Sequence, residues 1–593
     1  MACLCGTWLL AGCKSAGEAS RPNFVLIQLD DLGWDDLALH GNPYLRTPQL
    51  DALGRGAVRF DDFYVNPVCA PTRASLLTGR HFLRTGVSHV HGGKDYLDLG
   101  ERTLGDLLGE AGYVTGMWGK WHSGHGPGYE PWERGFDEAY MAQLYKHRDP
   151  QGVLNGTPVA FPGRWSSEVI VDYALGFMQR HRDSSFLAYL SFLTCHAPLD
   201  APDSSIAVYT RQGLSPKLAT LYGMIDLLDQ QIGRLMAGLD EMGLAGRTVV
   251  IFLSDNGPAV NNGDLSEADR AMRYVSGYLG HKGNLWENGV KSPLFIRWPG
   301  VLAPGVRTQL ADVTDLLPTL LDMAGVALPP GHRPLDGRSL WPVLQDSTQQ
   351  RPGKQTFDYA NPGWPPTDQP WTPQGIKDEY RPLSPADKAA LDYEQQILSV
   401  RDDSFKLMLN AAAYAQTPPP IRNRVLVDLR TDPKERRNVL TVYPDQARRL
   451  EADLVRWVGE IKASPISFGS PLFTLRDSVL RIPVKGAFAL DSGLKKTSNW
   501  VEGWDRPGEA LYVQLQVDTP GRYVAQVRVL PPGGDVRTWS LQVGTQAVVL
   551  SGETLASPEA MDLASGPQTL SLRWQGIVPQ PELRVSEVIL QRK

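Results

Sequence analysis

Short hydrophobic runs alternate with longer amphipathic stretches along the chain from residue 22 onward. Four of these runs, at 24–29, 114–118, 186–193 and 249–253, have the length and composition of buried strands. The alternation is typical of an α/β domain in which helices sandwich a mixed, largely parallel sheet. One helical stretch is especially regular, because its apolar residues recur every three or four positions and predict a face buried in the core. These residues are Leu218, Leu221, Ile225, Leu228, Ile232, Leu235 and Leu239.

The pattern changes twice toward the C-terminus. First comes a predicted small α+β subdomain that consists of a strand, a second strand and a helix. The three stretches are, in that order, ILSVRDDSFKLMLN, VLVDLRTDPKERRNVL and RRLEADLVRWVGEI. Beyond them, short alternating runs separated by Gly and Pro turns predict an antiparallel β-sandwich. We therefore expect a signal and tether at 1–20, a main domain at 21–390, a subdomain at 391–464 and a β-sandwich at 470–593.

The N-terminus indicates export. Residues 2–12 form an apolar segment that is far shorter than a membrane-spanning helix and is typical of a signal sequence. It ends in Leu10-Ala11-Gly12-Cys13, which resembles the lipobox of bacterial lipoproteins. The resemblance implies cleavage before Cys13 and a lipid on that cysteine, which would anchor the protein in the periplasm or at the cell surface. The alternative is an ordinary cleaved signal peptide, and in both cases the protein is exported.

Charge and cysteine content narrow the picture. A net charge of -6 with mixed signs and no basic stripe argues against nucleic acid as a partner. Cleavage would remove Cys3 and Cys5, and acylation would occupy Cys13, so only Cys69 and Cys195 remain in the mature chain. We interpret Cys195 as a buried core residue. Cys69 is left without an obvious purpose.

Polar residues follow each of the four predicted strands. They are Asp30 and Asp31, then Lys120 and His122, then His196, and finally Asp255 and Asn256. In a parallel sheet the carboxyl ends of the strands lie along one edge, where ligands bind, so these residues are expected to meet in one cleft. Taken singly, each has a plainer explanation as a helix cap, a turn or a hydrogen-bonded structural residue.

Together these side chains indicate a particular chemistry. Hard oxygen donors are offered by Asp30, Asp31, Asp255 and Asn256. Such donors suit Ca²⁺, with Mg²⁺ as the alternative, and they disfavour zinc or copper. Basic side chains would stabilise an oxyanion, and imidazoles would move protons; the candidates are Arg73, Lys120, Lys282, His122 and His196. The set predicts the transfer of a sulfuryl or phosphoryl group.

Cys69 lies in the stretch VCAPTRASLLTGR, at the predicted start of a helix. Pro71 suits the first helical turn, so residue 69 lies near the N-cap, where free backbone N–H groups attract anions. We expect this position to lower the pKa of the thiol. A thiolate is nevertheless a poor match for a hard cation, so a different group is expected there.

The stretch resembles the C-x-P-x-R signature of type I sulfatases, members of the alkaline phosphatase-like superfamily in which this cysteine becomes Cα-formylglycine. The likeness covers about residues 21–462, because further motifs follow in the family's order. They are Pro22-Asn23 to Asp30-Asp31, Gly112-Tyr113 to Gly119-Lys120-Trp121-His122, His196-Ala197-Pro198, Ser254-Asp255-Asn256-Gly257, and Lys282-Gly283 to Trp298-Pro299-Gly300.

The resemblance implies a role for each residue. Ca²⁺ would be held by Asp30, Asp31, Asp255, Asn256 and the modified Cys69. Arg73 and Lys120 would stabilise the formylglycine hydrate, and His122 would hydrogen-bond to it. Lys282 and Lys120 would grip the sulfate, and His196 would protonate the leaving alcohol. A formylglycine-generating maturase is then a required partner.

The substrate is expected to be a sulfated polysaccharide or oligosaccharide. The C-terminal sandwich is similar in texture to carbohydrate-binding modules, and Trp500, Trp504, Trp539 and Trp574 are its candidates for stacking on sugars. A loop at 360–382, with Trp364 and Trp371, is a second candidate contact with ligand. Two alternatives stay open: a phosphatase or phosphonate monoester hydrolase of the same superfamily, and an inactive glycan-binding lipoprotein.

Overall fold

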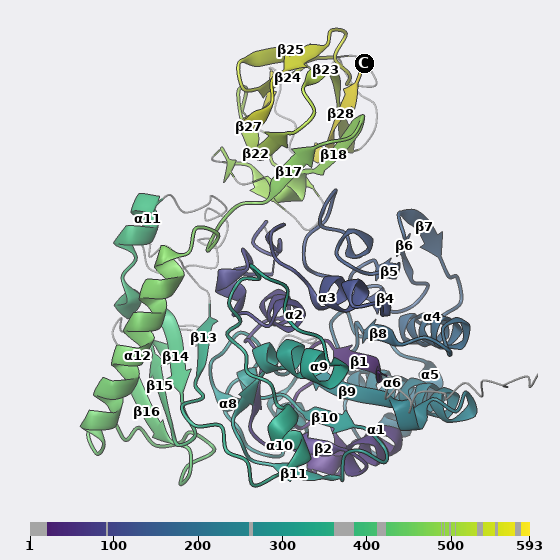
Figure 1. Cartoon of the computed structure of the whole chain (residues 1–593), viewed down its shortest axis with the longest axis vertical. Helices are drawn as coiled ribbons and strands as arrows, with labels where there is room; N and C mark the ends of the chain where they lie inside the picture. Colours follow the sequence, from purple (N-terminus) through teal and green to yellow (C-terminus); the bar gives the residue numbers. More distant parts are fainter. Residues whose placement is uncertain are drawn as a thin grey trace, which may run out of the picture.

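The computed structural model describes residues 21–90, 93–259, 265–360, 385–411, 423–487, 489–491, 493–496, 500–504, 506–530, 538–551, 555–575 and 583–593. The expected lipidation site Cys13 and the loop residues Trp364 and Trp371 lie outside these ranges. Among the helices in these ranges, none has the length and apolar character needed to cross a membrane. A large α/β body carries a smaller sheet at one side and a β-sandwich at one end (Figure 1).

A ten-stranded sheet in the order β11-β2-β10-β9-β1-β8-β4-β5-β6-β7 forms the centre of the body. Its strands β9, β1, β8, β4 and β5 are parallel neighbours, whereas β10 and the hairpin β6–β7 run antiparallel. The mixed, largely parallel sheet predicted from the sequence is confirmed. The strands are β1 Asn23–Leu29, β2 Val58–Phe60, β4 Val114–Gly119, β5 Glu138–Ala142, β6 Gln151–Leu154, β7 Thr157–Ala160, β8 Phe186–Ser191, β9 Thr248–Ser254, β10 Leu294–Arg297 and β11 Gly305–Arg307.

Helices cover both faces of this sheet. Strand β1 alternates between the two cores: Val25 and Ile27 pack with α1, α4 and α6, whereas Phe24 and Leu26 pack with α2, α3, α9 and α10. All seven apolar residues that define the predicted helical stripe are buried along α6. The helices of the body are α1 Pro48–Arg55, α2 Cys69–Thr78, α3 Leu104–Glu110, α4 Ser166–Arg180, α5 Asp203–Thr210, α6 Pro216–Glu241, α7 Glu267–Arg273, α8 Glu287–Val290, α9 Leu316–Ala324 and α10 Trp341–Gln345; the short strands β3 Phe63–Tyr64 and β12 Ala311–Asp312 pair with each other.

A four-stranded antiparallel sheet, β13–β16, lies beside the body and is covered by the amphipathic helix α12. The segment that we predicted as one strand is a hairpin, β14–β15, because the polar residues between its two apolar runs form the turn. The sheet also includes β13, which precedes the boundary expected at residue 390. Its elements are β13 Thr356–Ala360, β14 Ile397–Arg401, β15 Phe405–Leu409, β16 Arg424–Asp428 and α12 Pro444–Ala463, with α11 Pro385–Ala390 nearby in sequence.

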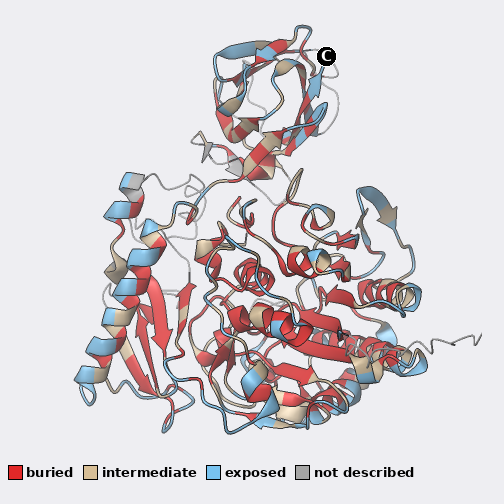
Figure 2. Ribbon diagram, in the orientation of Figure 1, coloured by how far each residue is buried: buried red, intermediate tan, exposed pale blue. Residues whose placement is uncertain are grey.

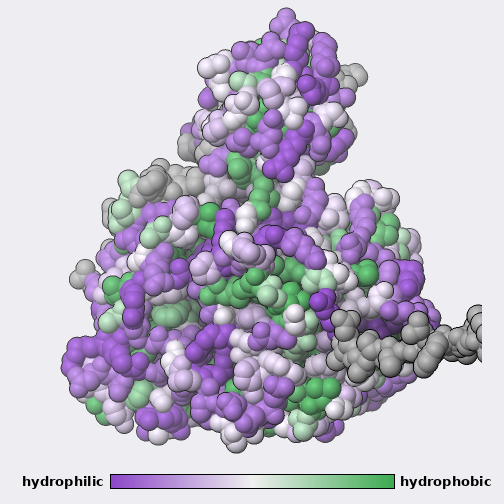
Figure 3. Space-filling model, in the orientation of Figure 1, coloured by the Kyte–Doolittle hydropathy of each residue, from purple (hydrophilic) through white to green (hydrophobic). Residues whose placement is uncertain are grey.

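The C-terminal region consists of two six-stranded sheets that share one hydrophobic core. Most neighbours in these sheets are antiparallel, as predicted, and β17 pairs in parallel with β22. The surface of this sandwich is mostly hydrophilic in Figure 3. Its strands are β17 Leu472–Leu475, β18 Val479–Pro483, β19 Ala489–Leu490, β20 Lys495–Lys496, β21 Val501–Glu502, β22 Ala510–Val517, β23 Gly521–Leu530, β24 Trp539–Val543, β25 Gln546–Leu550, β26 Met561–Leu563, β27 Gly566–Trp574 and β28 Arg584–Arg592.

The sandwich is docked on the body by side chains that both parts share. Tyr96 and Tyr129 of the body belong to the sandwich core, where both rings contact Phe473. The Tyr129 hydroxyl also accepts a hydrogen bond from the Leu472 amide at 2.9 Å. Because Tyr129 lies in the segment that follows β4, the sandwich is fixed to the same segment that carries His122.

Candidate active site

The ends of β1, β4, β8 and β9 bring the predicted residues together at the carboxyl edge of the sheet. Asp30, Lys120 and Asp255 are at most 1% exposed, and the strands that carry them are buried on both sides (Figure 2). His196, in the loop after β8, and Lys282 reach the same cluster, and each keeps 19% of its side chain exposed. The site therefore has a fully buried floor and an opening formed by a lysine and a histidine.

Three carboxylates and three cations of the site pair with one another. Lys120 Nζ lies 2.7 Å from Asp30 Oδ2, and Lys282 Nζ lies 2.5 Å from Asp31 Oδ1. The third pair places Arg73 on Asp255, with Nε and Nη2 of the guanidinium at 3.0 and 2.6 Å from Oδ2. Each carboxylate of the cluster therefore has one cationic partner, as a buried charge requires.

The pKa values of the carboxyl groups depend on these neighbouring charges. Burial raises the pKa of Asp30, but Lys120, His196, Lys282 and Arg73 outweigh it, so this pKa falls well below its usual range. Burial and the charge on Asp30 together raise the pKa of Asp255 to about 6. The two carboxyl groups therefore differ in acidity although both lie on the floor of the site.

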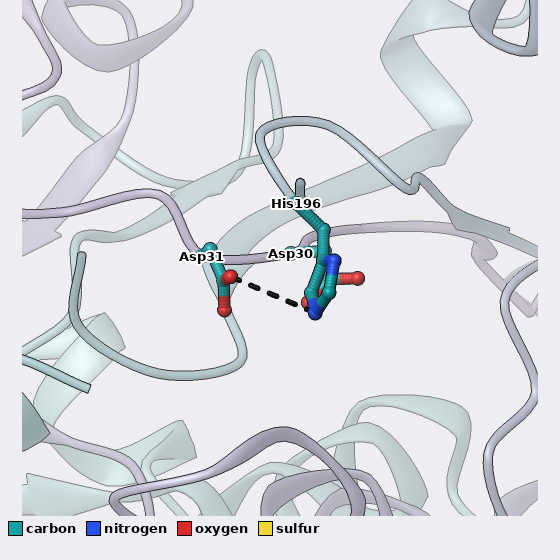
Figure 4. Close-up of side chains that lie close together, drawn as sticks. All are labelled: Asp30, Asp31 and His196. Atoms are coloured by element: carbon teal, nitrogen blue, oxygen red, sulfur yellow. Dashed lines mark ion pairs between the residues drawn. The ribbon is translucent and has the colours of Figure 1, made fainter. Parts of the chain in front are cut away.

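The carboxylates also form groups with the geometry of metal ligands. Single donor atoms of Asp30, Cys69 and Asp255 lie within 4.8 Å of one another, as do those of Asp30, Asp31 and His196. Figure 4 shows the second group, with His196 Nε2 facing Asp31 Oδ2 at 3.9 Å.

Two buried oxygens in this cluster have no hydrogen-bond partner among the described residues, Asp30 Oδ1 and Asn256 Oδ1. Asn256 is oriented by its amide nitrogen, which donates to Asp31 Oδ1 at 2.8 Å. A buried polar atom without a partner costs free energy, so these oxygens point to a missing positive ligand. An oxygen-rich donor set of this kind fits a hard divalent cation such as Ca²⁺ or Mg²⁺.

Cys69 begins α2, as the sequence predicted, and is 2% exposed. Its Sγ lies 3.4 Å from His122 Nδ1, while His122 Nε2 donates to the Val90 carbonyl at 2.6 Å. The expectation that the helix start would lower the pKa of this thiol is wrong: burial raises the pKa, and it outweighs the lowering by Lys120 and Lys282. The unmodified side chain is therefore a neutral thiol at neutral pH.

Two residues beside His196 were missed by the sequence analysis. The ring of Tyr145 stacks on the His196 ring at 4.4 Å, and His147 Nε2 donates to the His196 carbonyl at 2.8 Å. Burial lowers the pKa of His196 despite the nearby Asp30 and Asp31. Tyr145 and His147 lie beyond the end of β5 with no motif around them, and only the parallel pairing of β4 and β5 would have placed them at this edge.

Three of the four tryptophans that we named for sugar stacking are core residues. Trp504, Trp539 and Trp574 are at most 1% exposed and pack inside the sandwich. Trp500 is half-buried, with its ring under the Arg584 guanidinium and its Nε1 donating to Glu502. The expectation is wrong for the three buried residues because an amphipathic strand places its tryptophans on the inner face as readily as on the outer one.

The mixed sheet with its helices on both faces has the alkaline phosphatase-like fold. A profile described as Sulfatase matches residues 22–326, and one described as N-sulphoglucosamine sulphohydrolase, C-terminal, matches residues 278–381. The chain belongs to the sulfatase family and is a sulfuric ester hydrolase.

Named relatives agree with this assignment. N-acetylgalactosamine-6-sulfatase of Rattus norvegicus is 33% identical over 58% of this chain and 69% of its own length. Arylsulfatase A of Homo sapiens is 34% identical over 60% of this chain and 73% of its own length.

Solved structures share the fold. The structure of Ps i-CgsB in complex with k-i-k-neocarrahexaose has a TM-score of 0.62 at 22% identity and covers 75% of this chain and 94% of that one. Phosphonate monoester hydrolase of Agrobacterium radiobacter has a TM-score of 0.51 at 19% identity and covers 74% of this chain and 96% of that one. At these identities the likeness is one of fold.

Proposed function

We propose that this sulfatase hydrolyses sulfate esters of glycans with a formylglycine at position 69 and a bound Ca²⁺. The observation that carries the proposal is the buried cluster itself, in which Cys69 shares a possible ligand group with Asp30 and Asp255. A thiol serves no evident purpose among hard oxygens, whereas an oxygen-bearing group at the same position would complete their set.

The metal would be held by Asp30, Asp31, Asp255, Asn256 and residue 69. When bound, Ca²⁺ would supply positive charge that stabilises the sulfate oxygens in the transition state. The partnerless Asp30 Oδ1 and Asn256 Oδ1 support this ligand set. Arg73 keeps Asp255 in place from the opposite side, and it also donates to the Lys120 carbonyl at 3.1 Å and to Ser191 Oγ.

Formylglycine would supply, once hydrated, the hydroxyl that serves as nucleophile toward sulfur. His122 is placed to hold that group, since its Nδ1 already faces residue 69 while its Nε2–H is fixed on a backbone carbonyl. Lys120 and Lys282 would neutralise the sulfate from the floor and from the opening of the site.

His196 is the group that would protonate the leaving alcohol from its imidazolium form, which burial opposes and the charges of Asp30 and Asp31 favour. It lies at the opening, where the sugar must sit if the sulfate points toward Cys69, and its Nδ1 is held by the Ala197 carbonyl at 2.6 Å. That contact leaves Nε2 as the nitrogen that faces the cluster. Stacking on Tyr145 keeps the ring in this orientation.

A sulfated glycan is the proposed substrate class. The name of the rat relative specifies a sulfated amino sugar, and Ps i-CgsB was solved in complex with k-i-k-neocarrahexaose. We further propose that a maturase modifies Cys69 and that a lipid on Cys13 anchors the exported protein in the periplasm or at the cell surface. Metabolic labelling with a fatty acid, compared between the wild type and Cys13→Ala, tests the anchor.

Two measurements test the chemistry. Mass spectrometry of the peptide that contains residue 69 is expected to show a loss of about 18 Da relative to cysteine. The modified enzyme is then assayed on an aryl sulfate and the matching aryl phosphate, and turnover of the sulfate should dominate. A preference for phosphate would support the phosphatase alternative, and a modified protein with no turnover would support the inactive one.

The variant Cys69→Ser provides the matched control. It is expected to lose turnover on the aryl sulfate while keeping its Tm, because the side chain is small and its removal leaves the packing of α2 intact. Activity close to that of the wild type would contradict a nucleophile at this position.

A further inference from the structure

A cavity of about 640 Å³ lies beside the active site along the same edge of the sheet. Its walls are the end of β5 with the loop that follows, the hairpin β6–β7, His125, and Lys485 of the β-sandwich. Tyr145, which stacks on His196, is part of its lining. The cavity therefore lies next to the opening of the active site, and a volume of this size accommodates a sugar unit.

The backbone at Lys485 is held in place by the core of the sandwich. Lys485 lies between Val484 and Gly486, which are both buried, in a single turn of 3-10 helix after β18. A Cβ on Gly486 would lie 2.5 Å from the Phe473 ring, so the turn is pressed directly against the residue that joins the sandwich to the body. The side chain of Lys485 thus projects from a rigid base.

The ammonium of Lys485 makes no hydrogen bond or ion pair with any residue that the structure describes. Asp95 and Glu130 are close enough to act on its charge, but neither lines the cavity. Glu130 instead accepts from the Gly126 amide at 2.7 Å, and Asp95 faces His122 Nε2 at 3.8 Å. Burial lowers the pKa of Lys485 to about 8, so most of the lysine is still charged at neutral pH.

We propose that Lys485 binds a second anionic group of the substrate, on the sugar unit next to the one that loses its sulfate. The group is a carboxylate or a second sulfate, which an ammonium recognises equally as a point charge. This inference rests on the proposed glycan sulfatase function. It makes the β-sandwich a part of the substrate-binding site, because Lys485 is the only lysine or arginine among the described residues that line this cavity.

The competing explanation is that Lys485 only balances the charges of Asp95 and Glu130. A balancing charge contributes to stability and affects all substrates alike. A binding charge affects only substrates that carry the second anion. Selectivity between matched substrates separates the two.

The experiment compares the wild type with Lys485→Met on two pairs of substrates. In the first pair, N-acetylgalactosamine-6-sulfate is compared with a disaccharide that adds a uronate to the same sulfated sugar. In the second, neocarrageenan oligosaccharides differ by one sulfate on the neighbouring sugar. For each pair we measure the ratio of kcat/KM between the richer and the poorer member, or of Ki against an aryl sulfate where a member is not cleaved.

Lys485→Met is expected to lower this ratio about tenfold for at least one of the two substrate pairs. An effect of this size lies between those measured for exposed and for buried ion pairs. Lys485→Arg should restore it. Arg481→Gln is the control, because Arg481 lies four residues earlier, pairs with Glu587 at 3.2 Å and does not line the cavity. The pair that responds identifies the anion as carboxylate or sulfate.

A ratio that Lys485→Met leaves unchanged for both pairs overturns the inference, as does a wild type that prefers the poorer member in both. Failure of the proposed function itself looks different, because modified wild-type enzyme would then not turn over the aryl sulfate at all.

Discussion

Replacement of Arg73 by lysine tests whether the buried guanidinium organises the floor of the active site. Arg73 is fully buried and donates four hydrogen bonds: two to Asp255, one to the Lys120 carbonyl and one to Ser191 Oγ. Lysine keeps the positive charge but has a single nitrogen, so it can retain Asp255 only by giving up the other two acceptors.

The expected cost comes from Ser191 Oγ, which loses its donor, and from the second hydrogen bond to Asp255; the Lys120 carbonyl still accepts from the Ser191 hydroxyl at 2.6 Å. A buried acceptor without a donor costs about 1–3 kcal/mol and a hydrogen bond to a charged group contributes about 1.5–3 kcal/mol, so Arg73→Lys should destabilise the protein by about 2.5–6 kcal/mol. A loss of this size lowers Tm by several degrees. Turnover should also fall, by roughly 100-fold or more, because the strand end that carries Lys120 loses its anchor and the charges of the site are no longer preorganised.

Arg273→Lys is a matched control at a second buried arginine of the body. Arg273 is also fully buried and pairs with Asp36 through Nε at 2.8 Å and Nη2 at 2.5 Å, while Nη1 donates to the Ala259 carbonyl at 3.2 Å. We expect this variant to lose stability by a similar mechanism but to keep its turnover when assayed well below its Tm. Thermal unfolding followed by tryptophan fluorescence, and kcat/KM on an aryl sulfate, provide the two readouts.

The reasoning is refuted if Arg73→Lys melts within a degree of the wild type, because the four hydrogen bonds would then contribute almost nothing. It is also refuted if both variants lose turnover equally, since Arg73 would then have no greater part in the site than Arg273.

Three further predictions concern the acid, the metal and a buried carboxyl group. His196→Ala should lower turnover about 10²–10⁴-fold on substrates with poor leaving groups and less on activated aryl esters; equal losses on both would exclude an acid role. Protein stripped with a chelator should gain about 2.7 kcal/mol of stability when Ca²⁺ is returned at 100 times its Kd. Asn256→Leu should remove most of this gain. A Tm that changes with neither Ca²⁺ nor Mg²⁺ would contradict the metal site. Burial raises the pKa of Asp358 to about 7, so the folded protein keeps a proton that the unfolded chain loses near pH 4. Stability should therefore fall between about pH 4 and pH 7 by up to about 1.4 kcal/mol per unit, and Asp358→Asn should flatten the plot of Tm against pH; an unchanged slope would show that Asp358 is not the source.

Four strands of the parallel sheet, β1, β4, β8 and β9, were predictable because each is a buried apolar run; β5, which pairs in parallel with β4, was not predicted. The same logic placed Asp30, Lys120, His196 and Asp255 at one edge, since parallel strands must end together. The helix start at Cys69 was readable from Pro71. In these cases the residues that form the sequence pattern are also the residues that determine where the strand or helix lies in the fold.

Other features depend on contacts that a local pattern does not contain. The thiol of Cys69 becomes less acidic because the protein removes it from water, which outweighs the helix start. The inward orientation of Trp539 and Trp574 depends on strand register, and each could have faced either way. The place of Lys485 beside the active site depends on how the sandwich docks through Tyr129 and Phe473, more than 340 residues apart in the chain.

The packing of α2 also sets an order of events during synthesis. Ala70 and Ala74, on either side of Arg73, belong to the same hydrophobic cluster as Leu398 of β14 and Leu454 of α12. The segments that complete this cluster are made some 390 residues after Cys69, which at 5–20 residues per second is roughly 20–80 s later. Until then the side of α2 that carries Ala70 and Ala74 lacks these partners, and Cys69 itself becomes enclosed when the folding body places His122 and Lys120 beside it. The proposed conversion of Cys69 must therefore compete with folding, so the yield of active protein should depend on the rates of synthesis and folding as well as on the supply of maturase.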